Sequence, residues 1–181
     1  SLAYGEAGSI LQYFRDKSLE NPSFFYSVQL DNEELITNIF GPMLMDYGQF
    51  GDVVTFDTTY KLNCAHRPFA SFVGFNHHRE TVIFGAALMY DETVDSFVWL
   101  FRRFLEAMSS TAPKTIFTDH DAAMAKSIPI VKPNTTHRLC TWHLMQNALR
   151  HANSIFKDKE AKGKGMKSFL SKFMCDIEDE D

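Results

Sequence analysis

The sequence has few of the features that mark secreted or membrane-spanning proteins. Its three cysteines, Cys64, Cys140 and Cys175, lack the spacing of a disulfide framework, so we expect a reducing compartment. Its longest apolar stretches, such as 81–90, are far shorter than the roughly 20 residues of a membrane span. No segment resembling a signal peptide opens the chain, and Ser1 in place of Met suggests an excised piece. We therefore expect a soluble protein without membrane association.

The chain also lacks an excess of positive charge. It has 18 Lys and Arg against 23 Asp and Glu, a formal net charge of -5. Non-specific nucleic-acid binding depends on neutralising phosphates with cationic side chains, so this segment is not expected to bind strongly by itself. Any DNA contact should be local, metal-assisted or made by another part of the parent protein. By contrast, the 45% hydrophobic content and 17 Phe are enough for one sizeable core.

The first 50 residues predict a helix followed by a hairpin. Residues 9–19 place apolar side chains on one helical face before an Asn-Pro pair. The β-prone runs 24–30 and 35–40 are separated by four polar residues, a pattern typical of a hairpin. A short helix or turn is expected within 43–50. We interpret residues 1–50 as an N-terminal extension.

Residues 51–155 are predicted to form the main domain. Short apolar runs alternate there with turn residues and acids, and the expected order is three strands, then helix, strand, helix, strand and helix: 53–60, 69–75, 81–90, 94–108, 115–118, 122–128, 136–140 and 142–154. Strands with short connections are naturally antiparallel, and strands separated by helices are naturally parallel. The expected α/β fold is therefore an RNase H-like mixed sheet, with three antiparallel strands followed by alternating helices and parallel strands.

Two aspartates are candidates for metal-assisted chemistry. Asp57 lies inside an apolar run, where an unpaired carboxylate is costly to bury, and Asp119 ends a second apolar run. Because their strands should be parallel neighbours, we expect both carboxylates near one end of the sheet. Two such acids can hold Mg²⁺ or Mn²⁺ for phosphodiester displacement. The alternative is that each Asp caps a strand or helix; Asp121 is assigned the helix N-cap role.

A Cys-x-x-His pair, Cys140 and His143, lies at a predicted strand-to-helix junction. Such a pair could supply two zinc ligands, which is half of a tetrahedral site. His137 is close in sequence, but no second pair with suitable spacing follows unless Cys175 folds back. The alternative is a buried Cys and a hydrogen-bonded His.

Four short blocks in order carry a family resemblance over nearly the whole chain. They are Asn21–Tyr26, Gly51–Tyr60 with the turn at Arg67–Ala70, Thr118–Met124 and His137–His143. Together they resemble the plant far-red impaired response and far-red-related sequence family, which carries a Mutator-like (MULE) transposase domain.

The resemblance implies a transposase-derived protein that now acts in the nucleus as a transcription activator of the light-signalling type, without transposition. Zinc and DNA binding are then expected in flanking zinc-finger domains, and protein partners or a dimer here. Asp57 and Asp119 would be the transposase-like catalytic acids, vestigial in such a protein. The family's third acid follows a helical insertion, of which 156–181, with its acidic end, is the expected start. The alternative is a metal-dependent DDE-type transposase acting on DNA phosphodiesters.

Overall fold

The computed structural model describes residues 6–21, 24–32, 36–42, 47–59, 66–141 and 143. The chain divides into two compact units, Ser1–Arg138 and Leu139–Asp181, and nearly all described residues belong to the first. Most of the predicted helix 142–154 and the whole expected insertion 156–181 lie outside the described residues, so the predicted domain limits stay predictions. Among the described residues, no helix is both long and apolar enough for a membrane span.

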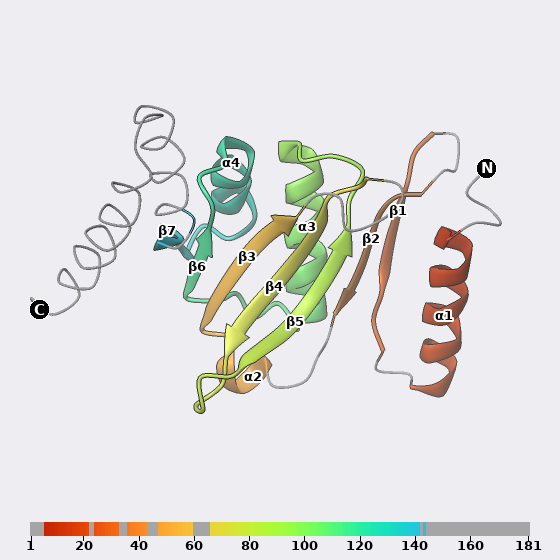
Figure 1. Cartoon of the computed structure of the whole chain (residues 1–181), viewed down its shortest axis with the longest axis horizontal. Helices are drawn as coiled ribbons and strands as arrows, with labels where there is room; N and C mark the ends of the chain where they lie inside the picture. The colour runs from red at the N-terminus through yellow and green to blue at the C-terminus, as the bar shows by residue number, and fades with distance from the viewer. Residues whose placement is uncertain are drawn as a thin grey trace, which may run out of the picture. The chain divides into compact units, whose positions relative to one another are not determined.

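The described residues form an α/β arrangement of four helices and seven strands (Figure 1). In chain order they are α1 (Glu6–Glu20), β1 (Ser27–Leu30), β2 (Ile36–Pro42), α2 (Tyr47–Phe50), β3 (Val53–Thr59), β4 (Phe69–Phe75), β5 (Thr81–Leu88), α3 (Val94–Ala107), β6 (Thr115–Thr118), α4 (Ala122–Val131) and β7 (Thr136–Leu139).

All seven strands belong to one mixed sheet with the order β1-β2-β5-β4-β3-β6-β7. Strands β3, β4 and β5 are antiparallel neighbours, whereas β6 pairs with β3 in parallel, after the chain has passed through α3. This confirms the predicted mixed sheet. The predicted N-terminal hairpin also forms, and its strand β2 pairs antiparallel with β5, so the hairpin extends the same sheet.

The main core lies between the sheet and α3, which Figure 1 shows behind strands β3 to β5. Helix α3 carries Phe97, Phe101 and Phe104 at three- and four-residue spacings, and all three are fully buried. Phe104 stacks on Phe72 of β4 with 4.0 Å between ring centroids, and Phe101 meets Phe56 of β3 edge-on at 5.0 Å. Fully burying one such side chain contributes about 1.5–3 kcal/mol, so this row of rings holds the helix on the sheet.

Helix α1 packs on the opposite face of the sheet. On β2, Phe40 points toward α3 and contacts the Phe104 ring, and alternation turns its neighbours Ile39 and Gly41 the other way. Ile39 clusters with Phe14 of α1, and a Cβ on Gly41 would lie 3.2 Å from Cζ of Phe14. The two faces of the sheet are thus covered by different helices.

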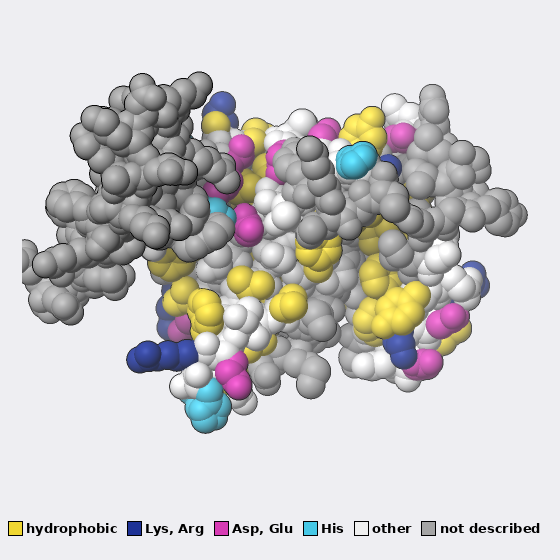
Figure 2. Space-filling view, viewed as in Figure 1, with side chains coloured by type: hydrophobic (Ala, Val, Ile, Leu, Met, Phe, Trp, Pro, Cys, Tyr) yellow, Lys and Arg dark blue, Asp and Glu magenta, His cyan; other side chains and the backbone are white. Residues whose placement is uncertain are grey.

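Part of the α1-side face carries exposed apolar side chains on β3, β4 and β5. The exposed fractions are 47% for Val53, 36% for Phe69, 58% for Phe75 and 45% for Ile83. Figure 2 shows hydrophobic side chains gathered over these strands, in contrast to the buried rings on the α3 side. Among the described residues, these side chains give the sheet an exposed apolar surface.

The close fit of the core at Gly74 is testable. A Cβ added at this buried β4 position would lie 2.4 Å from Cε2 of Phe84, whose fully buried ring is itself packed against Tyr47. We expect Gly74→Ala to lower the free energy of unfolding by about 1–3 kcal/mol, measured by urea denaturation. Gly48→Ala is the control, because a Cβ there meets nothing within 4 Å. Equal stability of the two variants would contradict the packing described.

Candidate functional site

Asp57 lies half-buried in the second half of β3. Its neighbour Phe56 is fully buried among the rings under α3, so alternation turns the Asp57 side chain to the other face of the sheet. There it shares a cross-strand position with Ser71 of β4. The Asp57 carboxylate therefore lies outside the aromatic core. The free-energy cost of burying a carboxylate among apolar side chains is thereby avoided.

Asp119 immediately follows β6 and is also half-buried. The parallel register pairs Val53 with Thr115 and Thr55 with Phe117. Continued by two residues, the same register would align Asp57 with Asp119 on the same face. The observed pairing ends at Thr55 and Phe117, and Asp119 lies just past the end of β6, so the approach of the two carboxylates stays a prediction.

The start of this parallel pair is fixed by contacts at the other end of the strands. The backbone N–H of Thr115 donates to the Asp52 carbonyl at 3.0 Å, and Lys114 Nζ lies 2.6 Å from Asp52 Oδ2. The ion pair is exposed, with 78% of the Lys114 and 67% of the Asp52 side chain accessible, so the backbone bond contributes more to the alignment. Sequence reasoning did not find this anchor.

The acid pair offers two carboxylates to a cation. This number fits Mg²⁺, which is commonly bound by one or two carboxylates and keeps several waters. A third carboxylate, Glu92, accepts a hydrogen bond from Thr58, whose side chain alternates to the face opposite Asp57. Within the part of the chain that the structure describes, no group of three His, Cys, Asp or Glu residues comes together. Roles of Asp57 and Asp119 in metal binding or catalysis stay predictions.

A buried hydroxyl and an imidazole support the backbone at Asp119. Thr118 is fully buried, and its Oγ1 donates to the Asp119 carbonyl at 2.8 Å. The same oxygen is hydrogen-bonded at 2.8 Å to Nε2 of His137, and the imidazole tautomer decides which of the two atoms donates. Burial lowers the pKa of His137, which favours the neutral ring. The pair thereby links β7 to the end of β6.

Asp121 caps helix α4, as predicted. Its Oδ1 accepts a 2.8 Å hydrogen bond from the backbone N–H of Met124, so Asp121 is the N-cap of α4.

The Cys-x-x-His pair is described only in part. Cys140 is a half-buried free thiol, and His143 is half-buried. A closed zinc site needs four ligands, and the described residues bring no third His, Cys, Asp or Glu to these two. Zinc at Cys140 and His143 stays a prediction. Cys64 and Cys175 lie outside the described residues.

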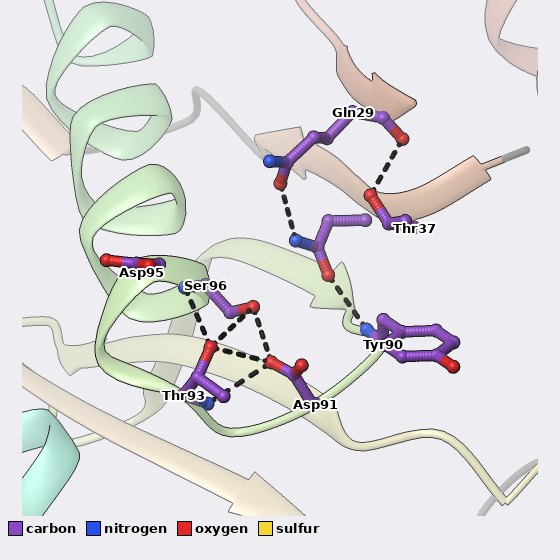
Figure 3. Close-up of a pocket in the computed structure, with 8 residues that line it drawn as sticks. Gln29, Thr37, Tyr90, Asp91, Thr93, Asp95 and Ser96 are labelled. Atoms are coloured by element: carbon purple, nitrogen blue, oxygen red, sulfur yellow. Dashed lines mark hydrogen bonds between the residues drawn. The ribbon is translucent and has the colours of Figure 1, made fainter. Parts of the chain in front are cut away.

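A polar hollow of about 230 Å³ lies between the β1–β2 hairpin and the start of α3 (Figure 3). One oxygen of Asp91 accepts from the backbone N–H of Thr93 and from the hydroxyls of Thr93 and Ser96. These bonds lower the pKa of Asp91 although burial opposes the shift. Across the hollow, Asn38 donates to Gln29 Oε1 at 2.7 Å and accepts from the Tyr90 N–H at 2.8 Å. The polar side chains that line the hollow mainly hydrogen-bond to one another. These bonds join the β1–β2 hairpin to the core.

Asn38 is expected to contribute most to this junction, because its amide makes two hydrogen bonds and is only 2% exposed. Asn38→Ala removes both hydrogen bonds, and we expect it to lower the free energy of unfolding by about 1–3 kcal/mol. Gln29→Ala removes only the bond between these two side chains and should lower the free energy of unfolding by less. Urea denaturation of both single variants and the double variant measures the coupling; a purely additive double variant would contradict the bond between these side chains.

The Thr118 hydroxyl provides a second test. Thr118→Val keeps the shape but removes the oxygen that contacts Asp119 and His137, and should cost about 1–3 kcal/mol in urea denaturation. Thr115→Val on the same strand is the control, since its hydroxyl makes no hydrogen bond with the other described residues. Equal effects of the two substitutions would show that the Thr118 contacts do not stabilise this edge of the sheet.

Known proteins are similar to this chain in the regions that contain the sequence blocks. The MULE transposase domain model matches residues 53–147, just over half of the chain. Protein FAR1-RELATED SEQUENCE 5 of Arabidopsis thaliana is 43% identical over 155 residues, covering 84% of this chain and 20% of that protein. Protein FAR-RED IMPAIRED RESPONSE 1 of the same plant is 36% identical over 176 residues, covering 96% of this chain and 20% of that protein. The chain thus spans about a fifth of the length of these curated relatives. These matches confirm the resemblance carried by the four blocks, and the chain belongs to the FAR-RED IMPAIRED RESPONSE family of proteins with a MULE transposase domain.

Proposed function

We propose that this segment is the central, transposase-derived domain of a nuclear transcription activator in light signalling, and that it acts without transposing DNA. One observation carries the proposal. An alignment that covers 96% of the chain relates it to a protein whose name states an impaired response to far-red light. The described residues that match the MULE domain model include the complete β3 to β7 part of the sheet.

We further propose that the fold is RNase H-like. The support is the arrangement of β5, β4, β3, β6 and β7 in that spatial order, with the first three antiparallel and β6 parallel to β3. Helices α3 and α4 connect β5 to β6 and β6 to β7, as the predicted topology requires. In such a fold the acids lie on the central strand and its parallel neighbour, which are β3 and β6 here.

The role of this segment is proposed to be contact with protein partners or with a second copy. Two features support this role. The net charge of -5 disfavours direct phosphate contact, so DNA binding is assigned to zinc-containing flanking domains of the parent protein. The exposed Val53, Phe69, Phe75 and Ile83 give the sheet an apolar face suited to protein contact.

The alternative function is a DDE-type transposase, and the parallel pairing of β3 with β6 favours it, because that register, if continued, would align Asp57 with Asp119. In that case the two carboxylates would hold Mg²⁺, which would supply charge stabilisation and an activated oxygen nucleophile for phosphodiester displacement. Asp57 would orient the ion from the central strand, and Asp119 from the strand end beside it. A third acid, expected beyond the helical insertion, would complete the set.

The two functions differ in how they depend on the acids. In the full-length protein, we expect the double substitution Asp57→Asn and Asp119→Asn to leave activation of a far-red-responsive reporter within about twofold of wild type. Asp52→Asn is the control, because this carboxylate is exposed and lies at the other end of β3. A loss of activation confined to the double variant would overturn the non-enzymatic proposal.

The same proteins should be incubated with terminal-repeat DNA and Mg²⁺ or Mn²⁺. We expect no cleavage or joining by any of them. Cleavage by the wild type that is lost on Asp57→Asn would establish the transposase alternative. Failure of the full-length protein to occupy any promoter in chromatin would instead favour a scaffold without a DNA-linked role.

A further inference from the structure

Lys132 is buried at the C-terminal end of α4, where its backbone N–H donates to the Ile128 carbonyl. Only 2% of the residue is exposed. Its Nζ lies 4.7 Å from the ring centroid of Phe104, 5.0 Å from that of Phe101 and 5.8 Å from that of Phe72. Among the described residues Nζ has no hydrogen-bond partner. A lysine side chain is rarely buried in this way unless it is paired.

The elements packed around Lys132 bring no carboxylate to it. Strand β4 contains no ionisable side chain, and on α4 itself Lys126 is exposed. The ionisable residues of α3 are Asp95, Arg102, Arg103 and Glu106; Asp95 and Glu106 are exposed, and Glu106 pairs with Arg103 at 2.8 Å. In the described part of the chain, no ion pair includes Lys132.

Only the ring faces therefore offset the loss of water around a protonated amine. Contact with the aromatic ring faces favours the protonated amine over the neutral one by a factor on the order of tens. Burial acts in the opposite direction and lowers the pKa of Lys132 from 10.5 to about 7, roughly a thousandfold or more in the protonation equilibrium. Burial is thus the larger of the two effects. While Lys132 is buried in the folded structure, its amine loses the proton near pH 7.

We propose that Lys132 is a proton-sensitive latch that keeps the C-terminal end of α4 packed on α3 and β4 when its amine is neutral and releases it more readily when the amine is protonated. The released lysine regains water, and the buried space beside the three Phe rings opens. Because α4 begins at Ala122, three residues after Asp119, and is capped by Asp121, the latch acts on the helix that follows this candidate acid.

The sign of the pH effect follows from the two protonation equilibria. An opened Lys132 binds a proton up to about pH 10.5, whereas the closed one loses it near pH 7. Between these values the open state holds more protons, so raising the pH stabilises the closed state. Below about pH 7 both states are protonated, and the opening equilibrium no longer changes with pH.

Hydrogen exchange of the α4 amides in the 181-residue chain tests the latch. After correction for the intrinsic exchange rate, the wild-type opening constant should fall by no more than about twofold from pH 6 to 7 and by up to about tenfold from pH 7.5 to 8.5. Lys132→Met should open less at pH 6 and lose this dependence. Lys126→Met, on an exposed position of the same helix, should behave as wild type. The same pH dependence in Lys132→Met as in wild type would overturn the proposal.

A direct titration keeps the proposal testable even if Lys132→Met does not fold. The side-chain ε-carbon signals of isotope-labelled lysines in the wild-type protein report each amine separately. One lysine is expected to titrate near neutral pH, and the exposed lysines near pH 10 or above. If every lysine of the folded protein titrates above pH 9, the amine is protonated in the closed structure and the latch does not exist.

Discussion

The rings of Phe72 and Phe104 stack with 4.0 Å between their centroids, and the Phe56 and Phe101 rings meet beside them. This contact between α3 and the middle of the sheet fixes which face of β3 and β4 is buried. Because side chains alternate along a strand, a buried Phe56 turns Asp57 outward, and a slip by one residue would bury the carboxylate instead. The aromatic packing and the position of the acid are therefore one constraint.

That constraint reaches the second acid through the parallel pairing of β3 with β6. Ile116 is fully buried on the same side as Phe56, so β6 presents alternate residues to the same two faces. Asp119 then follows on the Asp57 side, and the bond from Thr118 to its carbonyl holds the chain where the strand ends. The geometry of the acid pair thus depends on core packing, which persists whether or not the acids act in catalysis. The positions of the two acids are therefore not by themselves a sign of catalysis.

The local pattern of the sequence was sufficient for most of the sheet. Short apolar runs bounded by turn residues and acids predicted β3, β4, β5 and β6, and the three- and four-residue spacing of Phe and Leu residues predicted α3. Prediction of α4 ended near Ile128, whereas the helix continues through Pro129 to Val131. A Pro there removes a backbone donor but does not stop the preceding turns from packing, so tertiary contact extends the helix.

Other features depend on contacts between distant parts of the chain, and no local pattern specifies them. The hairpin strands β1 and β2 were expected, but their place beside β5 and the Asn38 network were not. The burial of Lys132 could not be read from the sequence either, since a lysine after a helix usually points to solvent.

Helix α4 shows how these long-range contacts bear on the candidate site. Its first turn is held by Asp121, two residues after Asp119, and its last turn ends at Lys132 among the rings that also hold α3. The helix therefore connects the acid edge to the aromatic core. Ten helical residues separate the Asp121 cap from Lys132, so α4 spans the distance between the Asp119 end of β6 and the aromatic core.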